Sequence, residues 1–302
     1  MEAPHSAHFF RAERDFWWNL DHIEVWARRV GLDGVRSVLD VGAGVGHWGR
    51  LLSNVLAPDA TLVGIDREPR WVEEATERAA EAGLADRFSY RLSTAEELPF
   101  EDESFDLVTC QTLLIHVADA RAVIDEMVRV TKRGGLVVAS EPNNRALTLM
   151  VTSVSAGDSL EERLDLVRFY VTCEEGKIAV GHGNSSLGDL VPGYFNEAGL
   201  EEIQACQSDK VSLMVPPYDD PAQEALKEAY LWDAEAGGGW GWTKEEARRY
   251  FEAGGGDPVV FDGMWDRRLD EARRLAAAIE HGTYHAAGGD VLYLVSGRRP
   301  IG

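Results

Sequence analysis

The segment from Val38 to Arg50 reads V-L-D-V-G-A-G-V-G-H-W-G-R, an apolar strand that runs into three glycines at alternate positions and then into a helix. These glycines are Gly42, Gly44 and Gly46. Glycine has no Cβ and tolerates a positive φ, so a ligand can approach such a turn closely and meet the N–H groups of the following helix. Asp40 adds a carboxylate at the end of the strand. The segment predicts a ligand-binding turn, but several classes of cofactor use one.

A second apolar strand, Thr61 to Ile65, ends at Asp66, about 20 residues after the last of these glycines. In a doubly wound α/β sheet, an acidic residue at this position binds both hydroxyls of an adenosine ribose. The alternative is that Asp66 caps the helix that follows Glu68 and Pro69. We favour the ribose role because of the glycines upstream.

Short apolar segments alternate with amphipathic ones through the first half of the chain, which indicates crossover connections and a parallel sheet. The strands are rich in β-branched residues, as expected of a sheet covered on both faces. Strands are expected at 37–41, 61–65, 88–91, 105–110 and 136–140, and helices at 16–30, 47–56, 71–82 and 121–131.

After Pro142 this rhythm breaks, and the remainder is longer than one helix and two strands require. Apolar stripes predict helices there. They are expected at 158–173, 186–198, 222–236, 244–253 and 262–281, with strands at 201–213 and 291–296. Glycine runs at 237–239 and 254–256 are expected to act as flexible joints.

Three further segments follow the second strand in order: Arg91–Phe100, Ser104–Cys110 and Arg129–Pro142. They read R-L-S-T-A-E-E-L-P-F, S-F-D-L-V-T-C and R-V-T-K-R-G-G-L-V-V-A-S-E-P. Together with the glycine turn, they resemble the class I S-adenosylmethionine-dependent methyltransferases, most closely the small-molecule branch of quinone biosynthesis (type 11). The resemblance covers Arg36 to Pro142 and implies a doubly wound, mostly parallel seven-stranded sheet of Rossmann-like type, with an antiparallel last strand.

The resemblance also implies roles for individual residues in binding S-adenosylmethionine. Asp40 lies near the ammonium group, the three glycines line the methionine moiety, and Asp66 binds the ribose. Around the adenine the implied residues are Arg67, which flanks the ring; Thr94, which replaces the usual aspartate; and Ala95, whose N–H then carries more of the recognition. Gln111 stands where a backbone carbonyl meets the ammonium.

Methyl transfer from a sulfonium requires positioning, exclusion of water and, for a hydroxyl acceptor, removal of a proton. His116 stands in the expected active-site loop and is a candidate general base; alternatively it packs between Ile115 and Val117. Glu141 ends the fifth strand, where ligands of open α/β sheets bind. It is a candidate for orienting the acceptor, or a residue that caps the chain before Pro142.

The chain has 302 residues, with 52 Asp and Glu against 30 Lys and Arg, a net charge of −22. Such acidity disfavours a nucleic-acid partner, which requires basic patches. The sequence contains no apolar run of membrane-spanning length and no basic, apolar leader at Met1, so we expect a cytoplasmic protein without membrane contact. The three cysteines are scattered and suggest neither a disulfide framework nor a metal site.

We accordingly divide the chain into an N-terminal helical cap (1–34), a cofactor-binding core (35–145), a helical insertion (146–185), a core helix and strand six (186–214), a helical cap insertion (215–287) and the last core strand (288–302). The cap is expected to close over a small, partly apolar acceptor. A homodimer is left open. The alternatives are a nicotinamide-dependent oxidoreductase, and a methyltransferase-like protein that binds without catalysis.

Overall fold

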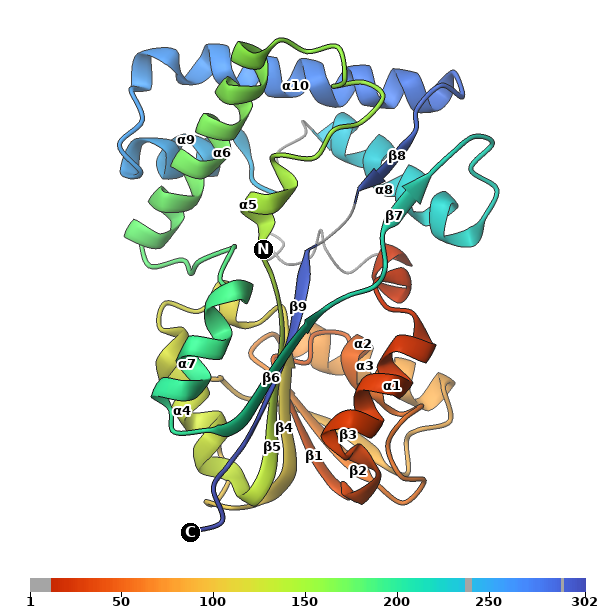
Figure 1. Cartoon of the computed structure of the whole chain (residues 1–302), viewed down its shortest axis with the longest axis vertical. Coiled ribbons are helices and arrows are strands. Elements are labelled where there is room, and N and C mark those ends of the chain that lie inside the picture. The colour runs from red at the N-terminus through yellow and green to blue at the C-terminus, as the bar shows by residue number, and fades with distance from the viewer. Residues whose placement is uncertain (1–11, 237–240, 289–290) are drawn as a thin grey trace. The chain divides into compact units, whose positions relative to one another are not determined.

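The computed structural model describes residues 12–236, 241–288 and 291–302 (Figure 1). The predicted joint at 237–239 lies outside the described residues. The chain forms two compact units. The first, called here the sheet unit, comprises Trp18–Asn143, Ser186–Asp209 and Leu292–Gly302. The second, the helical unit, comprises the described residues of Met1–Trp17, Asn144–Ser185 and Lys210–Val291. The boundaries of these two units differ from the boundaries of the segments proposed from the sequence.

The sheet unit is built on a seven-stranded sheet in the order β3-β2-β1-β4-β5-β9-β6. The first five strands along the chain pair in parallel, and β9 runs antiparallel to both β5 and β6. The predicted doubly wound, mostly parallel sheet with an antiparallel last strand is therefore confirmed. Its strands are β1 (Ser37–Val41), β2 (Thr61–Asp66), β3 (Phe88–Leu92), β4 (Phe105–Gln111), β5 (Thr131–Pro142), β6 (Glu201–Gln207) and β9 (Leu292–Arg298).

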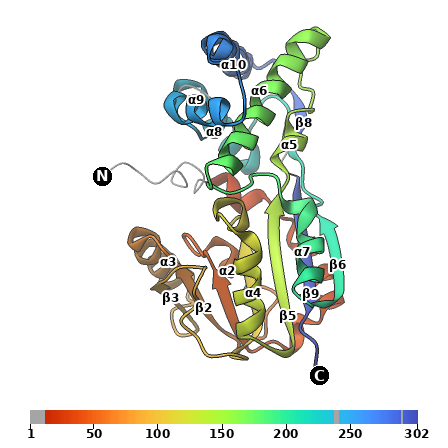
Figure 2. The same cartoon turned by 90° about the vertical axis from the view of Figure 1, so that its left-hand side faces the viewer.

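Helices cover both faces of this sheet, α4 and α7 on one side and α1, α2 and α3 on the other (Figures 1 and 2). Successive side chains of each strand point to opposite faces of the sheet, so a hydrophobic core lies on each face. Leu39 and Val41 pack in the cluster that includes Val123 of α4 and Phe195 of α7. The helices and 3₁₀ turns of the unit are α1 (Leu20–Val30), η3 (Leu32–Gly34), α2 (His47–Leu52), α3 (Pro69–Glu81), η4 (Leu114–His116), α4 (Ala120–Val130), η5 (Gly188–Leu190) and α7 (Val191–Glu197).

The predicted helix over 16–30 is shorter than expected, because α1 begins only at Leu20. Asn19 precedes it in an extended conformation, and its side-chain amide donates to Asp209 Oδ2 at 3.1 Å rather than capping the helix. The residues before it form a separate 3₁₀ helix, η2 (Ala12–Phe16), in the helical unit. The apolar stripe runs through both elements, so the sequence pattern does not show the break.

The predicted sixth strand, 201–213, is wrong in its second half. β6 ends at Gln207, and a separate strand β7 (Ser212–Met214) pairs in antiparallel with β8 (Ala286–Gly288) in the helical unit. Ser208 donates its N–H to the Leu292 carbonyl at 2.9 Å, which is the last ladder contact before the chain leaves the sheet. The two apolar segments look continuous in sequence, but they pair with different partners.

The helical unit contains a core of aromatic side chains from α6, α9 and α10. Gly176 of α6 lies directly against the Tyr250 carbonyl of α9, so a Cβ there would collide with backbone. The helices of the unit are α5 (Asn144–Leu147), α6 (Leu160–Ala179), α8 (Pro221–Ala236), α9 (Lys244–Ala253) and α10 (Pro258–Glu280). Within the described residues, no helix is long and apolar enough to cross a membrane.

Candidate functional site

Several residues singled out from the sequence lie at the carboxyl ends of neighbouring parallel strands in the sheet unit. The winding of the sheet reverses between β1 and β4, which are neighbours at its centre. Val41 of β1 pairs with Ile65 of β2 on one side and with Cys110 of β4 on the other. The glycine turn therefore follows the end of β1, and Asp66 and Gln111 are the last residues of the adjacent strands β2 and β4. This is the crevice in which open α/β sheets bind ligands.

The glycine turn adopts the backbone that was predicted for it. Gly42, Gly44 and Gly46 have φ values of 68°, 52° and 72°, which favour glycine. A Cβ at Gly42 would lie 2.6 Å from Leu113 Cδ1, and one at Gly46 would lie 2.6 Å from the Tyr90 hydroxyl oxygen. Two of the three glycines are thus required by the packing of protein side chains as well as by φ.

Asp66 joins the end of β2 to this turn. Its Oδ2 accepts a hydrogen bond from the Gly44 N–H at 2.9 Å, and its Oδ1 accepts one from the Glu68 N–H at 3.0 Å. The second bond is a local turn rather than a helix cap, since α3 begins at Pro69 with Glu68 in the capping position. Burial raises the pKa of Asp66, and its two backbone bonds counter that effect. Each carboxylate oxygen can accept a further bond, so both remain available to ribose hydroxyls.

Asp40 is the most unusual group of the site. Its side chain is 1% exposed, and among the described residues neither carboxylate oxygen has a hydrogen-bond partner. Burial raises the pKa of Asp40 to about 8; the nearby amide of Gly49 offsets part of this effect, and the charge of Asp66 adds to it. A buried carboxylate without a partner is costly unless a ligand compensates it.

The end of β4 carries a strained backbone and a second unsatisfied side chain. Gln111 is 6% exposed, and its Nε2 has no hydrogen-bond partner in the described part of the chain. Thr112 follows with a φ of 50°, which is unusual for a residue other than glycine, and its N–H donates to the Ser140 carbonyl at 2.9 Å. Such strain concentrates at ligand sites.

Glu141 supports the loop that carries His116. Its Oε1 accepts hydrogen bonds from the N–H groups of Leu113 and Leu114, each at 2.9 Å. Glu141 is fully buried, its Oε2 has no partner among the described residues, and burial raises its pKa to about 7. His116 is the half-buried last residue of η4. The loop that Glu141 caps is thus the one after β4, not the chain before Pro142.

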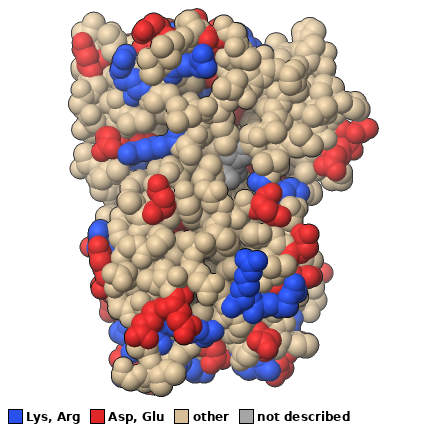
Figure 3. Space-filling model, in the orientation of Figure 1, with Lys and Arg blue, Asp and Glu red and all other residues tan. Residues whose placement is uncertain are grey.

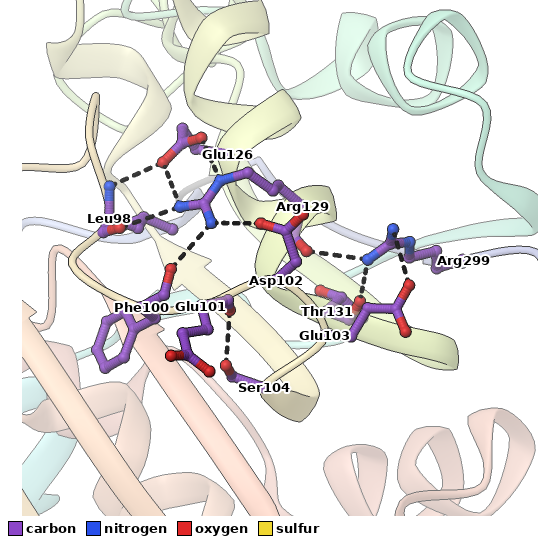
Figure 4. A network of polar contacts seen from close by, with 10 residues as sticks. All are labelled: Leu98, Phe100, Glu101, Asp102, Glu103, Ser104, Glu126, Arg129, Thr131 and Arg299. Carbon is purple, nitrogen blue, oxygen red and sulfur yellow. Dashed lines mark hydrogen bonds and ion pairs between the residues drawn. The ribbon is translucent and has the colours of Figure 1, made fainter.

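The predicted adenine-binding residues lie beyond β2 and β3. Arg67 and Thr94 are exposed and Ala95 is buried. The chain after Ala95 is fixed by Arg129 of α4, whose guanidinium donates to the carbonyls of Leu98 and Phe100 at 3.0 and 2.9 Å (Figure 4). The N–H of Leu98 in turn donates to Glu126 at 2.8 Å. The A-E-E-L-P-F segment is therefore held in place by α4.

Tyr90 of β3 is part of this site and was not predicted from the sequence. Its ring covers Gly64, where a Cβ would overlap it, and its buried hydroxyl reaches Gly46 without a hydrogen-bond partner in the described residues. The available signal was Gly64 itself, because a glycine inside a strand often marks a close approach by another group.

Comparison with known proteins agrees with this geometry. Residues 33–232 match the family described as a methyltransferase domain. Over 136 residues the chain is 38% identical to the uncharacterized methyltransferase YcgJ of Bacillus subtilis, covering 44% of this chain and 52% of that protein. Over 128 residues it is 38% identical to demethylmenaquinone methyltransferase of Staphylococcus aureus, covering 41% of this chain and 52% of that protein. The chain thus spans about half the length of the curated relatives it matches.

Two solved structures share the fold at low identity. A protein of Bacillus halodurans assigned to the methyltransferases has a TM-score of 0.51 at 19% identity, covering 93% of this chain and 99% of that one. A Galdieria sulphuraria protein assigned as a sarcosine dimethylglycine methyltransferase has a TM-score of 0.50 at 19% identity, covering 93% of this chain and 85% of that one. The sheet order, the glycine turn and the match over residues 33–232 lead to one conclusion: the chain belongs to the methyltransferase domain family.

Proposed function

We propose that this protein transfers a methyl group from S-adenosylmethionine to a small, partly apolar acceptor. The observation that carries the proposal is the buried Asp40 carboxylate, which lacks a hydrogen-bond partner among the described residues and lies below a turn of positive-φ glycines. A cationic ligand at this turn compensates that carboxylate. S-adenosylmethionine carries such charge on both its sulfonium and its ammonium group.

The other groups of the site fit the rest of this cofactor. Asp66 has acceptor capacity left for two ribose hydroxyls at the position typical of that role. Gln111 presents a buried amide nitrogen, Nε2, without a hydrogen-bond partner in the described chain. The exposed Thr94 and the buried Ala95 follow β3 on the side where the adenine is proposed to lie.

When bound, the cofactor supplies a methyl group that is already activated by the sulfonium charge. The residues of the chain then need only bind, orient and exclude water. For a hydroxyl acceptor, His116 would take the proton as a general base. Glu141 would act through the loop, because its hydrogen bonds to Leu113 and Leu114 fix the turn that carries His116.

A small-molecule acceptor is the choice best supported for this chain. The name demethylmenaquinone methyltransferase gives a small molecule as the acceptor of one relative. On the face drawn in Figure 3, Lys and Arg gather only in small groups among acidic side chains, and the net charge is −22. That charge disfavours a polynucleotide. A cytoplasmic location and a site without membrane contact belong to the same proposal.

Thermal unfolding with different ligands tests the proposal. S-adenosylmethionine and S-adenosylhomocysteine should raise the melting temperature, and nicotinamide dinucleotides should not. Asp66→Ala should lose most of the shift, while Asp86→Ala, which removes an exposed carboxylate of the same unit, should keep it. A shift with NADH alone would favour the oxidoreductase alternative.

A second assay separates an enzyme from a non-catalytic member of the family. The purified protein is incubated with methyl-labelled cofactor and fractions of small metabolites, and transfer of label is measured. Cofactor binding with no transfer to any fraction would favour a binding protein.

A further inference from the structure

Asp40 lies within a row of paired residues that crosses four strands of the sheet. Asp40 pairs with Gly64 of β2 and Thr109 of β4, and Gly64 pairs with Tyr90 of β3. Paired residues of parallel strands point to the same face, so these four positions form one line across the sheet. Because Gly64 has no side chain, the Tyr90 ring lies over it and closes the site on that side. On the other side, Thr109 accepts a hydrogen bond from Trp48 Nε1 at 2.8 Å.

Among the described residues, the charged and titratable groups around Asp40 form no hydrogen bond with its carboxylate. Asp66 on β2 is a second carboxylate, and its charge raises the pKa of Asp40. On β3 and β4 lie Tyr90 and Cys110, whose pKa values are raised by burial and by Asp40. From α2, His47 is buried and Arg50 donates to the Val45 carbonyl at 2.7 Å.

No ion pair joins Asp40 to a cation within residues 12–236, 241–288 and 291–302. An ionised Asp40 would therefore be a buried charge without a counterion, which proteins avoid by keeping the group protonated. Within the described part of the chain no such cation is paired with Asp40, so the ligand would supply the opposite charge. Binding of a cation then favours the carboxylate over the carboxylic acid.

We propose that Asp40 holds a proton in the ligand-free protein and releases it to solvent when S-adenosylmethionine binds, so that cofactor binding is coupled to the loss of one proton. The inference rests on the proposed function. In this step the O–H bond of the carboxylic acid breaks, the proton passes to buffer, and the carboxylate remains beside the cationic ligand. The raised pKa of Asp40, about 8, agrees with a protonated group at neutral pH.

Isothermal titration calorimetry tests this with the 302-residue chain and S-adenosylmethionine near pH 7. The titration is repeated in buffers of different ionisation enthalpy, and the slope of the observed heat against that enthalpy counts the protons released. We expect close to one proton for the wild type and close to none for Asp40→Asn. Asp86→Asn is the matched control, because it removes an exposed carboxylate of the same unit and should leave the count unchanged.

A second measurement needs no variant. If one proton is released, the affinity of the wild type should rise about tenfold from pH 6 to pH 7. Binding without proton release, or with the same release in Asp40→Asn, overturns this inference and leaves the proposed function standing. Failure of S-adenosylmethionine to bind at all overturns both. Release with S-adenosylhomocysteine as well would assign the effect to the ammonium, and release with S-adenosylmethionine alone to the sulfonium; either result supports the coupling.

Discussion

Replacement of Glu141 should show whether its carboxylate fixes the loop that follows β4 and carries His116. Glu141 accepts two backbone N–H bonds through Oε1, and its Oε2 has no partner among the described residues. Glu141→Gln keeps one acceptor oxygen in place. Glu141→Ala removes it and leaves the N–H groups of Leu113 and Leu114 without their acceptor.

The cost can be worked from these two bonds. Each buried donor left unsatisfied costs about 1–3 kcal/mol, so Glu141→Ala should lower the free energy of unfolding by about 2–5 kcal/mol once partial access of water to Leu113 is allowed. Below about pH 4.5, where Glu141 is uncharged in the folded and the unfolded state, Glu141→Gln should cost less, on the order of 1 kcal/mol, because only its new amide donor needs a partner.

The pH dependence gives an independent check. The pKa of Glu141 is raised from 4.5 to about 7, so the folded state keeps a proton that the unfolded state has lost. The unfolding free energy of the wild type should therefore fall as pH rises from about 4.5 to 7, by up to about 3 kcal/mol from this group. Glu141→Gln cannot ionise and should lack that part of the slope. Asp40 contributes a similar fall in both proteins and cancels in the comparison.

Chemical denaturation measures the change in the free energy of unfolding. Hydrogen exchange read by mass spectrometry measures the change in protection of individual amides. Two compact units need not unfold together, so the exchange of the Leu113 and Leu114 amides is the decisive readout. Glu141→Ala should expose both amides, while Glu141→Gln and the exposed control Glu97→Gln should not. Equal protection in Glu141→Ala and wild type would refute the role assigned to Oε1.

Four further outcomes follow from the site. Asp66→Ala should weaken S-adenosylmethionine binding by about 1–3 kcal/mol in calorimetry, the scale of a charge-assisted hydrogen-bond pair, and undiminished affinity would remove the ribose assignment. His116→Ala should bind the cofactor normally but lose turnover, and wild-type turnover would exclude it as the base. Gly46→Ala should lower stability by about 1–3 kcal/mol because of its positive φ, with part of the loss recovered by Tyr90→Phe, which removes the hydroxyl that the new Cβ would meet. Residues 158–173 should gain protection from exchange when cofactor and acceptor bind, and no change there would argue against the predicted cap.

The local features of the site were accessible from the sequence because they depend on short-range chemistry. Glycine's freedom at positive φ predicts the glycine turn. The alternation of apolar segments predicts the end of β2 at Asp66 and the order in which the strands follow one another along the chain. β1 and α9 match their predicted bounds residue for residue. The sequence also identified Asp40, but could not show that it is buried without a partner.

The rest depends on which strands become neighbours. Tyr90 reaches the glycine turn because β3 pairs with β2 and Gly64 leaves room for its ring, and Glu141 reaches Leu113 because β5 lies beside β4. The break after Gln207 arises because β7 pairs with β8 rather than with β9. The sequence by itself determined where strands and turns form and which groups stand at their ends. Only the tertiary structure decided which of these groups face one another, because the contacts join residues far apart in the chain through the register of the sheet.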